Sequence, residues 1–189
     1  MAARDLPRAA RAIDEFLDAM GVGDDPAVAG TGARVAEAWD ADLLGGADID
    51  VAQLLADEAW TTTKPGALVV LRDVYVTTTC PHHLMPALGD ATIAYLPGRK
   101  VAGLGTLVRV LHAFARRLTL QEEIGQRLVD ALHEHLHARG AVCRLRLTHS
   151  CLAARGERER AIVETLATSG TLSPGEPDAA LLSVALGSR

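Results

Sequence analysis

The sequence predicts an α+β fold in which helices cover one face of an antiparallel β-sheet. Three observations indicate this. Apolar residues recur at helical spacing in the first third of the chain, and β-branched residues gather after residue 66. The predicted elements then follow in the order helices, two strands, two helices and two strands. Strands and helices that come in groups are typical of α+β proteins rather than of regularly alternating α/β proteins.

The composition is that of one globular domain with its own core. The chain has 189 residues, 49% of them apolar, and a net charge of −5. It has no Lys/Arg block, no apolar run of about 18–20 residues and no signal-peptide core, so we expect no nucleic-acid partner and no membrane association. Three cysteines without an export signal are expected to be thiols or metal ligands in the cytoplasm.

Three helices are predicted in the first part of the chain. Residues 10–20 carry apolar side chains at helical spacing, and a second helix is expected from about Thr31, a candidate N-cap. A short third helix is predicted over 51–60. The segments 45–50 and 61–66 are expected to be loops.

The rest of the chain is predicted to supply the sheet and the helices that cover it. Four strands are expected, at about 67–77, 90–97, 141–151 and 160–170. Two helices are expected between the second and third strands, at 105–118 and 120–140, the longer one capped by Gly140. In the third strand, Cys143 and His149 share one face, and Cys143 is expected to be core. A weak helix is expected in the tail.

The stretch Thr79–His83, with the sequence TCPHH, has the pattern of a metal-binding turn. Cys80 and His83 can offer sulfur and nitrogen to one ion, and Cys151 follows a strand about seventy residues later. Three protein ligands are typical of a catalytic zinc, which keeps its fourth position for water and lowers the pKa of that water to about 7. His82 and His149 could move protons beside it. The alternative is two buried thiols and ordinary loop histidines.

A second pattern competes for the metal. The segment HEHLH matches the zinc-protease motif H-E-x-x-H, with His133 and His137 as ligands and Glu134 as base. The motif is short, however, and its histidines flank an apolar stripe near a helix end. There they would be favourably placed by the negative pole of the helix, so a solvated helix end is the preferred interpretation.

Several separate motifs, in order, resemble the GTP cyclohydrolase I family. They are CPHHLMPALGDATIAYLPGRKVAGL, FARRLTLQE and THSCLAARG, and the resemblance covers about residues 30–170. It implies a T-fold, a four-stranded antiparallel sheet with two long helices on one face, preceded by N-terminal helices. The implied division is a helical extension over 1–60, a catalytic domain over 61–172 and a tail over 173–189. It also implies a homo-oligomer, a decamer of two pentamers, with sites between subunits.

The resemblance implies a hydrolase that acts on cyclic amidine C–N bonds. Cys80, His83 and Cys151 would hold Zn²⁺, and hydrolysis at C8 of GTP would release formate and form 7,8-dihydroneopterin triphosphate. His82 and His149 would transfer protons. The implied substrate contacts are Glu122, with Gln121 beside it, for the guanine edge, and Arg109, Arg155 and Arg34 for the phosphates.

Three departures from the family pattern keep alternatives open. Pro81 replaces a glutamate in the metal turn, Gly105 and Thr106 replace a Ser-Lys pair, and TGAR at 31–34 replaces Thr-Pro-x-Arg. The lost lysine is a cation suited to a phosphate. One alternative is therefore a specialised paralogue that opens a less phosphorylated guanine-type substrate or stops before pterin closure. The other, from a different class, is a non-catalytic purine-binding T-fold subunit.

Overall fold

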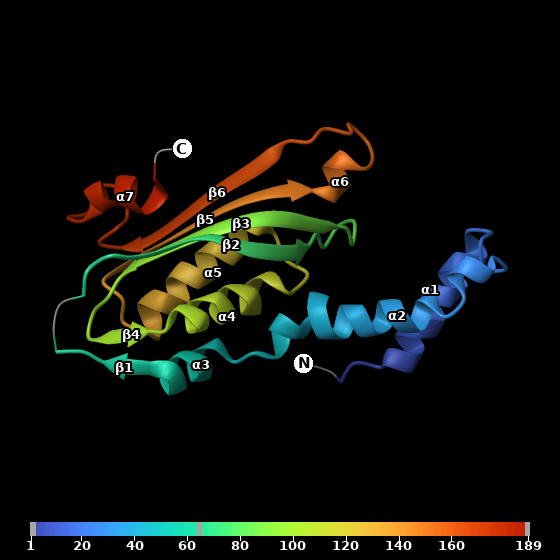
Figure 1. Ribbon diagram of the computed structural model, residues 1–189, viewed down its shortest axis with the longest axis horizontal. Coiled ribbons are helices and arrows are strands. Elements are labelled where there is room, and N and C mark those ends of the chain that lie inside the picture. Colours follow the sequence, from blue (N-terminus) through green and yellow to red (C-terminus); the bar gives the residue numbers. More distant parts are fainter. Residues whose placement is uncertain (1–2, 64–65, 188–189) are drawn as a thin grey trace.

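The computed structural model describes residues 3–63 and 66–187, and its body is a four-stranded antiparallel sheet in the order β2-β3-β5-β6 (Figure 1). The strands are β2 (Val69–Thr79), β3 (Pro86–Leu96), β5 (Gly140–His149) and β6 (Ile162–Gly170). All four predicted strands are therefore present. β3 begins at Pro86 rather than at residue 90, because its first residues pair with β2 on one side and β5 on the other.

Two registers determine what meets at one end of the sheet. In the β2–β3 hairpin, Thr79 pairs with Pro86, so the metal-binding turn predicted from the sequence is the connection between these strands. In the β3–β5 pair, Ala87 lies opposite His149. The end of β5 therefore reaches the turn, and the next residues form the short helix α6 (Ser150–Ala153) beside it.

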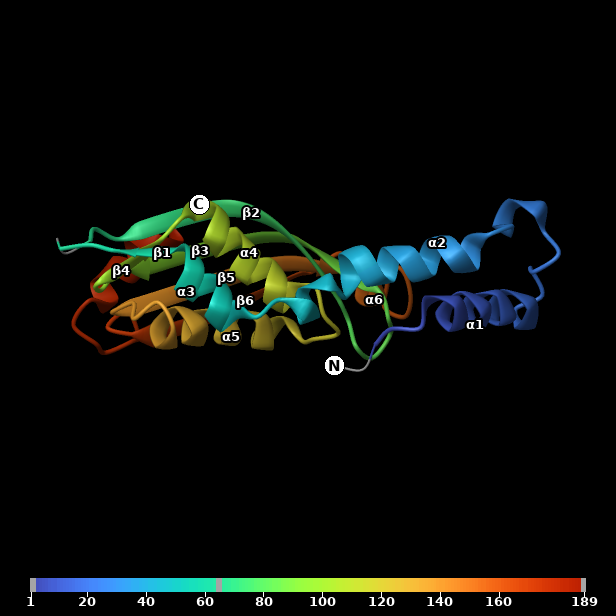
Figure 2. The same ribbon diagram turned by 90° about the horizontal axis from the view of Figure 1, so that it is seen from below.

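Helices α4 (Leu104–Ala115) and α5 (Gln121–Glu134) lie together on one face of the sheet, as predicted (Figures 1 and 2). Apolar side chains that recur at helical spacing are fully buried between helices and sheet, among them Leu107, Leu111, Ile124, Leu128 and Leu132. Cys143 and Leu145 face them from β5, so the prediction that Cys143 is a core residue is confirmed.

The predicted end of the long helix at Gly140 is wrong. α5 ends at Glu134, and His137, with a positive φ of 55°, reverses the chain while Ala138 N–H donates to Leu132 O (3.0 Å). Gly140 is the first residue of β5. A side chain there would meet the backbone N of Leu172 at 2.7 Å, so this glycine serves close packing rather than helix capping.

Two further elements lie beside the main sheet, of which the first was not predicted and the second is the helix expected in the tail. A small sheet joins β1 (Ala59–Thr61) to β4 (Lys100–Ala102), so the expected loop 61–66 begins inside a strand; residues 64–65 lie outside the described residues. The tail folds into a 3-10 turn and α7 (Leu182–Leu186), which covers part of the face of the sheet opposite α4 and α5 (Figure 1). Its Ala185 is buried in a cluster with Leu96, Val142 and Leu172.

The N-terminal helices extend away from the sheet (Figures 1 and 2). α1 (Leu6–Ala19) packs along α2 (Thr31–Ala38). The chain then passes through a π turn (Trp39–Leu43) and a 3-10 turn (Gly45–Asp48), the second of which lies in the expected loop 45–50. Gly30, with a φ of 71°, is the N-cap of α2, so Thr31 is its first residue and not its cap. α3 (Val51–Glu58) then packs against α4.

Within residues 3–63 and 66–187, no helix combines the length and the apolar character needed to cross a membrane.

Candidate active site and metal centre

The turn between β2 and β3 presents Cys80 and His83 on the same side. It is closed by two backbone hydrogen bonds, from Cys80 N–H to Met85 O (3.0 Å) and from Leu84 N–H to Cys80 O (2.9 Å). Neither bond uses the N–H of residue 81. Pro81 therefore fits this turn without removing a hydrogen bond that closes it.

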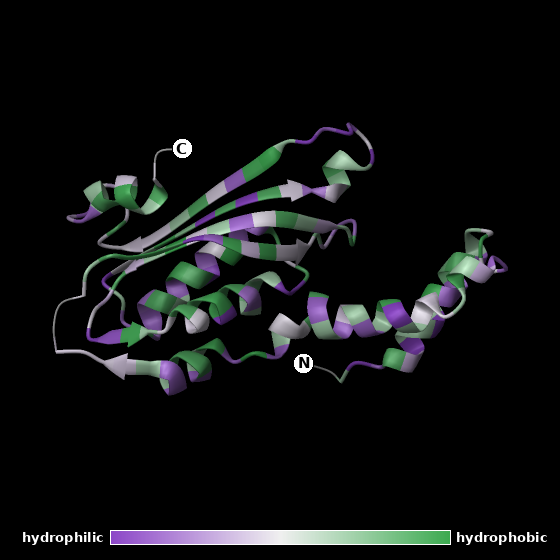
Figure 3. Ribbon diagram, in the orientation of Figure 1, coloured by the Kyte–Doolittle hydropathy of each residue, from purple (hydrophilic) through white to green (hydrophobic). Residues whose placement is uncertain are grey.

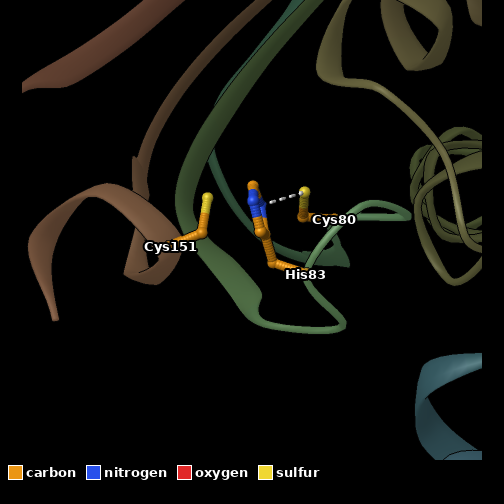
Figure 4. Close-up of side chains that lie close together, drawn as sticks. All are labelled: Cys80, His83 and Cys151. Atoms are coloured by element: carbon orange, nitrogen blue, oxygen red, sulfur yellow. Dashed lines mark hydrogen bonds between the residues drawn. The ribbon is translucent and has the colours of Figure 1, made fainter. Parts of the chain in front are cut away.

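Cys151 approaches Cys80 and His83 from α6, at the end of β5. It lies on α6, directly after β5, and its Sγ, the Cys80 Sγ and a His83 ring nitrogen all lie within 4.8 Å of one another (Figure 4). Cys80 Sγ and His83 Nδ1 are 3.6 Å apart. Among the described residues this is the group of Cys, His and acidic side chains whose ligand atoms converge closely enough to hold a metal ion.

The donor set fits zinc. Two thiolates and one imidazole are ligands that Zn²⁺ prefers, and three protein ligands leave one position open. Burial raises the pKa of the Cys151 thiol, the neighbouring Cys80 raises it further, and Arg155 lowers it. Without a cation the two thiols therefore repel each other as thiolates, and binding of a divalent cation would release protons.

The competing zinc-protease pattern does not form a site. α5 ends at Glu134, so His133 lies on the helix while His137 lies beyond it in the turn. His133 Nδ1 is 3.1 Å from Ala138 O, which fastens the helix end. The two histidines are not among the convergent ligand groups of the described residues.

A cleft of about 240 Å³ opens beside the candidate metal centre. Its walls include Cys80 and Pro81 from the turn, Glu122 from the first turn of α5 and His149 from the end of β5. Thr78, which is 3% exposed, also lines it, and its hydroxyl has no hydrogen-bond partner in the part of the chain that the structure describes. The cleft thus combines polar groups that can meet a ligand with one edge at the metal turn.

Gln121 fixes the orientation of His149. Its side chain is buried, and its Nε2 donates to Leu145 O (3.2 Å) and Val163 O (3.0 Å). Because carbonyl oxygens only accept, the amide Oε1 must face His149 Nε2, at 2.8 Å, and that ring nitrogen must carry the hydrogen. Nδ1 is then the nitrogen of His149 that can exchange a proton.

Two opposing effects act on the charge of His149. Burial lowers the pKa of this histidine, and the neighbouring Glu122 carboxylate raises it in part. His82 is exposed in the metal turn, its ring 6.2 Å from that of His83. Arg155 lies close enough to Cys151 to lower the pKa of that thiol. These three residues therefore lie around the same sheet end as the metal ligands.

The other two predicted phosphate contacts lie elsewhere in the chain. Arg34 is on α2, where it donates to Ala29 O (3.0 Å) and Thr31 Oγ1 (2.9 Å). Arg109 is on α4 and pairs with Glu58. Neither lines the cleft, so a single chain does not bring them to the candidate site.

Two residues of interest were missed by the sequence analysis. Thr78 lies in a strand rich in β-branched residues, and this pattern gives no sign that its hydroxyl is buried without a hydrogen-bond partner among residues 3–63 and 66–187. Glu58 ends a short helix and gives no sign of its partner, because its contact with Arg109 spans 51 residues.

A four-stranded antiparallel sheet with two helices on one face, and a Cys-His-Cys group beside a polar cleft, define a T-fold protein with a candidate metal centre. The chain belongs to the GTP cyclohydrolase I family, whose family model, described as GTP cyclohydrolase I, matches residues 9–182. The expectation of a hydrolase of this type is thereby confirmed.

Curated relatives support the same family. The chain is 36% identical over 186 residues to GTP cyclohydrolase 1 of Leifsonia xyli subsp. xyli, a match that covers 96% of this chain and 95% of the relative. It is 37% identical over 154 residues to GTP cyclohydrolase 1 of Chlorobaculum tepidum, a match that covers 79% of this chain and 68% of the relative.

Among solved structures, the crystal structure of the archaeosine synthase QueF-Like in the apo form is similar to this chain at a TM-score of 0.44 and 17% identity. The match covers 57% of this chain and 97% of that chain.

The candidate metal centre predicts which cysteines matter for metal content. Cys80→Ala and Cys151→Ala should each lose most of the bound zinc, because two protein ligands hold the ion much more weakly than three. Zinc per chain, measured by mass spectrometry after dialysis, checks this.

Two matched controls accompany the measurement. Cys143→Ala removes a thiol whose pKa burial raises to about 12, and His133→Ala removes the histidine of the competing pattern. Both variants should keep their zinc. Full zinc in Cys80→Ala and Cys151→Ala, or its loss only in His133→Ala, would contradict the assignment.

Proposed function

We propose that the protein is a zinc-dependent purine cyclohydrolase that hydrolyses GTP at C8, releases formate and forms 7,8-dihydroneopterin triphosphate. The observation that carries the proposal is the cleft in which Glu122 and His149 lie beside the convergent Cys80, His83 and Cys151. Zinc held by these three ligands would supply Lewis acidity and an activated water.

Glu122 is proposed to recognise the guanine edge. It is exposed at the first turn of α5, so its carboxylate is free to receive a ligand from the cleft. Two oxygens can accept parallel hydrogen bonds from the ring N–H and the exocyclic amino group of guanine. The positive end of the helix favours the carboxylate in its charged form.

His149 and His82 are proposed to transfer protons. The Nδ1 of His149 accepts a proton at neutral pH because the Nε2 hydrogen is held by Gln121. Gln121 is therefore proposed to serve the purine site by orienting His149. The exposed His82 can exchange protons between substrate and solvent. Arg155, near Cys151, is proposed to meet the phosphates, and Arg109 and Arg34 to meet them from neighbouring subunits.

One observation favours a second candidate, the specialised paralogue. Thr106, at the position of the family's lysine, is buried and donates to Glu58 (2.8 Å), so α4 presents a neutral side chain there. A triphosphate would meet one cation fewer. A less phosphorylated guanine-type substrate is the alternative that this feature supports.

The chain is also proposed to assemble into a homo-oligomer, the decamer of two pentamers. α1 has no buried residue; Phe16 on the helix and Met20, its C-cap, are 59% and 64% exposed. The helix pair α1–α2, with hydrophobic and hydrophilic residues along it, extends away from the body (Figure 3). The outer strands β2 and β6 are edges whose backbone groups need partners. Another copy of the chain would cover both features and bring Arg109 and Arg34 to a cleft.

The proposed reaction predicts equal amounts of formate and pterin from GTP. Zinc-loaded protein is incubated with GTP, GMP, guanosine and guanine, and formate and pterin fluorescence are assayed separately. Glu122→Gln should weaken substrate binding about tenfold or more, because an amide donor that the bound substrate covers would then face the ring N–H without an acceptor, at a cost of about 1–3 kcal/mol.

Glu123→Gln is the control, since it removes the same charge one position along α5. It breaks an exposed pair with Arg127, and the glutamine oxygen can still accept the hydrogen bond from Thr119 Oγ1 (3.2 Å). It should behave like the parent. Parent-like turnover by Glu122→Gln would remove Glu122 from the purine site. Formate without pterin, or formate from guanosine and not from GTP, would favour the specialised paralogue.

The oligomer is checked by light scattering at micromolar concentration. Ten chains of 19.9 kDa would give a particle of about 199 kDa. Phe16→Glu should shift the protein to smaller particles, because a charge would then lie in an apolar contact. A parent protein that is active at the mass of one chain would contradict the proposal.

A further inference from the structure

One carboxylate holds two residues of α4. Glu58, the last residue of α3, accepts a hydrogen bond from Thr106 Oγ1 (2.8 Å) and pairs with the Arg109 guanidinium through the same oxygen, Oε2. Thr106 and Arg109 lie three residues apart on one side of the helix. Both are therefore tied to a side chain from a different part of the chain.

The packing of α3 holds Glu58 beside Thr106 and Arg109. Val51 and Leu55 anchor the helix in the core, and Glu58 follows at the end that faces α4. The Glu58 side chain is 31% exposed and that of Arg109 is 53% exposed. A ligand can thus reach the arginine, but it meets a guanidinium whose charge is already balanced by a carboxylate.

We propose that Glu58 is a specificity-determining residue that lowers the affinity of Arg109 for substrate phosphates. It thereby reduces the factor by which the site prefers a guanine triphosphate to less phosphorylated guanine nucleotides. The inference rests on the proposed function, in which Arg109 meets the phosphates. Glu58 acts in two ways, both of which weaken phosphate binding. It neutralises Arg109, and it adds a negative charge of its own near the ligand.

The contact of Glu58 with Thr106 also affects what a lysine at position 106, as in the family pattern, could do in this chain. Because Thr106 is 4% exposed and bonded to Glu58, a lysine at this position would emerge beside the same carboxylate. Thr106→Lys alone would then form a second pair with Glu58 instead of offering a free cation. By contrast, Gly105 has open space around its Cβ position, so a serine fits there.

The test measures phosphate binding separately from turnover. The binding probe is inorganic tripolyphosphate, titrated by calorimetry into protein without added metal, because this ligand chelates zinc. Glu58→Gln keeps the shape of the side chain and an acceptor for Thr106 while removing the charge. It should tighten tripolyphosphate binding about fivefold, the scale of one partly exposed charge pair. In an Arg109→Ala background the same change should have less than about half of that effect, since its partner is gone.

Asp57→Asn is the matched control. It removes the same charge one position earlier, where the exposed carboxylate accepts from Gln53 Nε2 (2.7 Å) within α3. It should leave the tripolyphosphate affinity close to that of the parent, and equal melting temperatures would show that all variants are folded. In formate assays, Glu58→Gln should lower the KM for GTP about fivefold and leave the KM for guanosine nearly unchanged.

The outcomes separate this inference from the proposed function. Tighter tripolyphosphate binding without formate from any guanine compound would support the role of Glu58 and refute the reaction. Formate release with an unchanged tripolyphosphate affinity and an unchanged GTP-to-guanosine ratio in Glu58→Gln would overturn the role of Glu58 alone. Absence of tripolyphosphate binding in the parent and in Glu58→Gln would overturn it as well, because Arg109 would then not be a phosphate contact.

Discussion

The candidate site depends above all on the register between β3 and β5. Because Ala87 lies opposite His149, the end of β5 stops beside the turn that carries Cys80. The chain then enters α6, which brings Cys151 within reach of that turn. A shift by one residue would turn His149 to the other face of the sheet and move Cys151 away. Burial of alternate β5 side chains under α4 and α5 holds the register, since a slip would expose the core.

The same sheet divides the candidate site residues into two groups. One group lies at one end of the sheet and consists of the metal ligands, Glu122 and His149. The other group, Arg34 on α2 and Arg109 on α4, does not line the cleft. Gln121 shows how firmly the first group is built, because one buried amide ties α5 to β5, β6 and His149. The second group bonds within its own segment or to Glu58, an arrangement that agrees with the proposal that these arginines reach a ligand held by another copy.

Much of this could be predicted from the sequence, for reasons that differ between elements. Alternation in β5 and the apolar stripe of α5 are local patterns, so the four strands and the two covering helices were predicted correctly. The spacing of Cys80 and His83 indicated a shared metal because both lie in one turn. The end of α5, by contrast, depends on a left-handed His137 and on close packing of Gly140 against Leu172, neither of which a local pattern reveals. The β1–β4 pair and the contact of Glu58 with Arg109 join distant segments, so their partners become visible only in the fold.

The central claim is that Cys80, His83 and Cys151 hold one zinc with an open fourth position, and X-ray absorption at the zinc edge tests it most directly. The expected spectrum has two sulfur ligands at about 2.3 Å and two nitrogen or oxygen ligands at about 2.0–2.1 Å, one from His83 and one from solvent. A spectrum without sulfur, or with a coordination shell filled entirely by protein ligands, would contradict the claim.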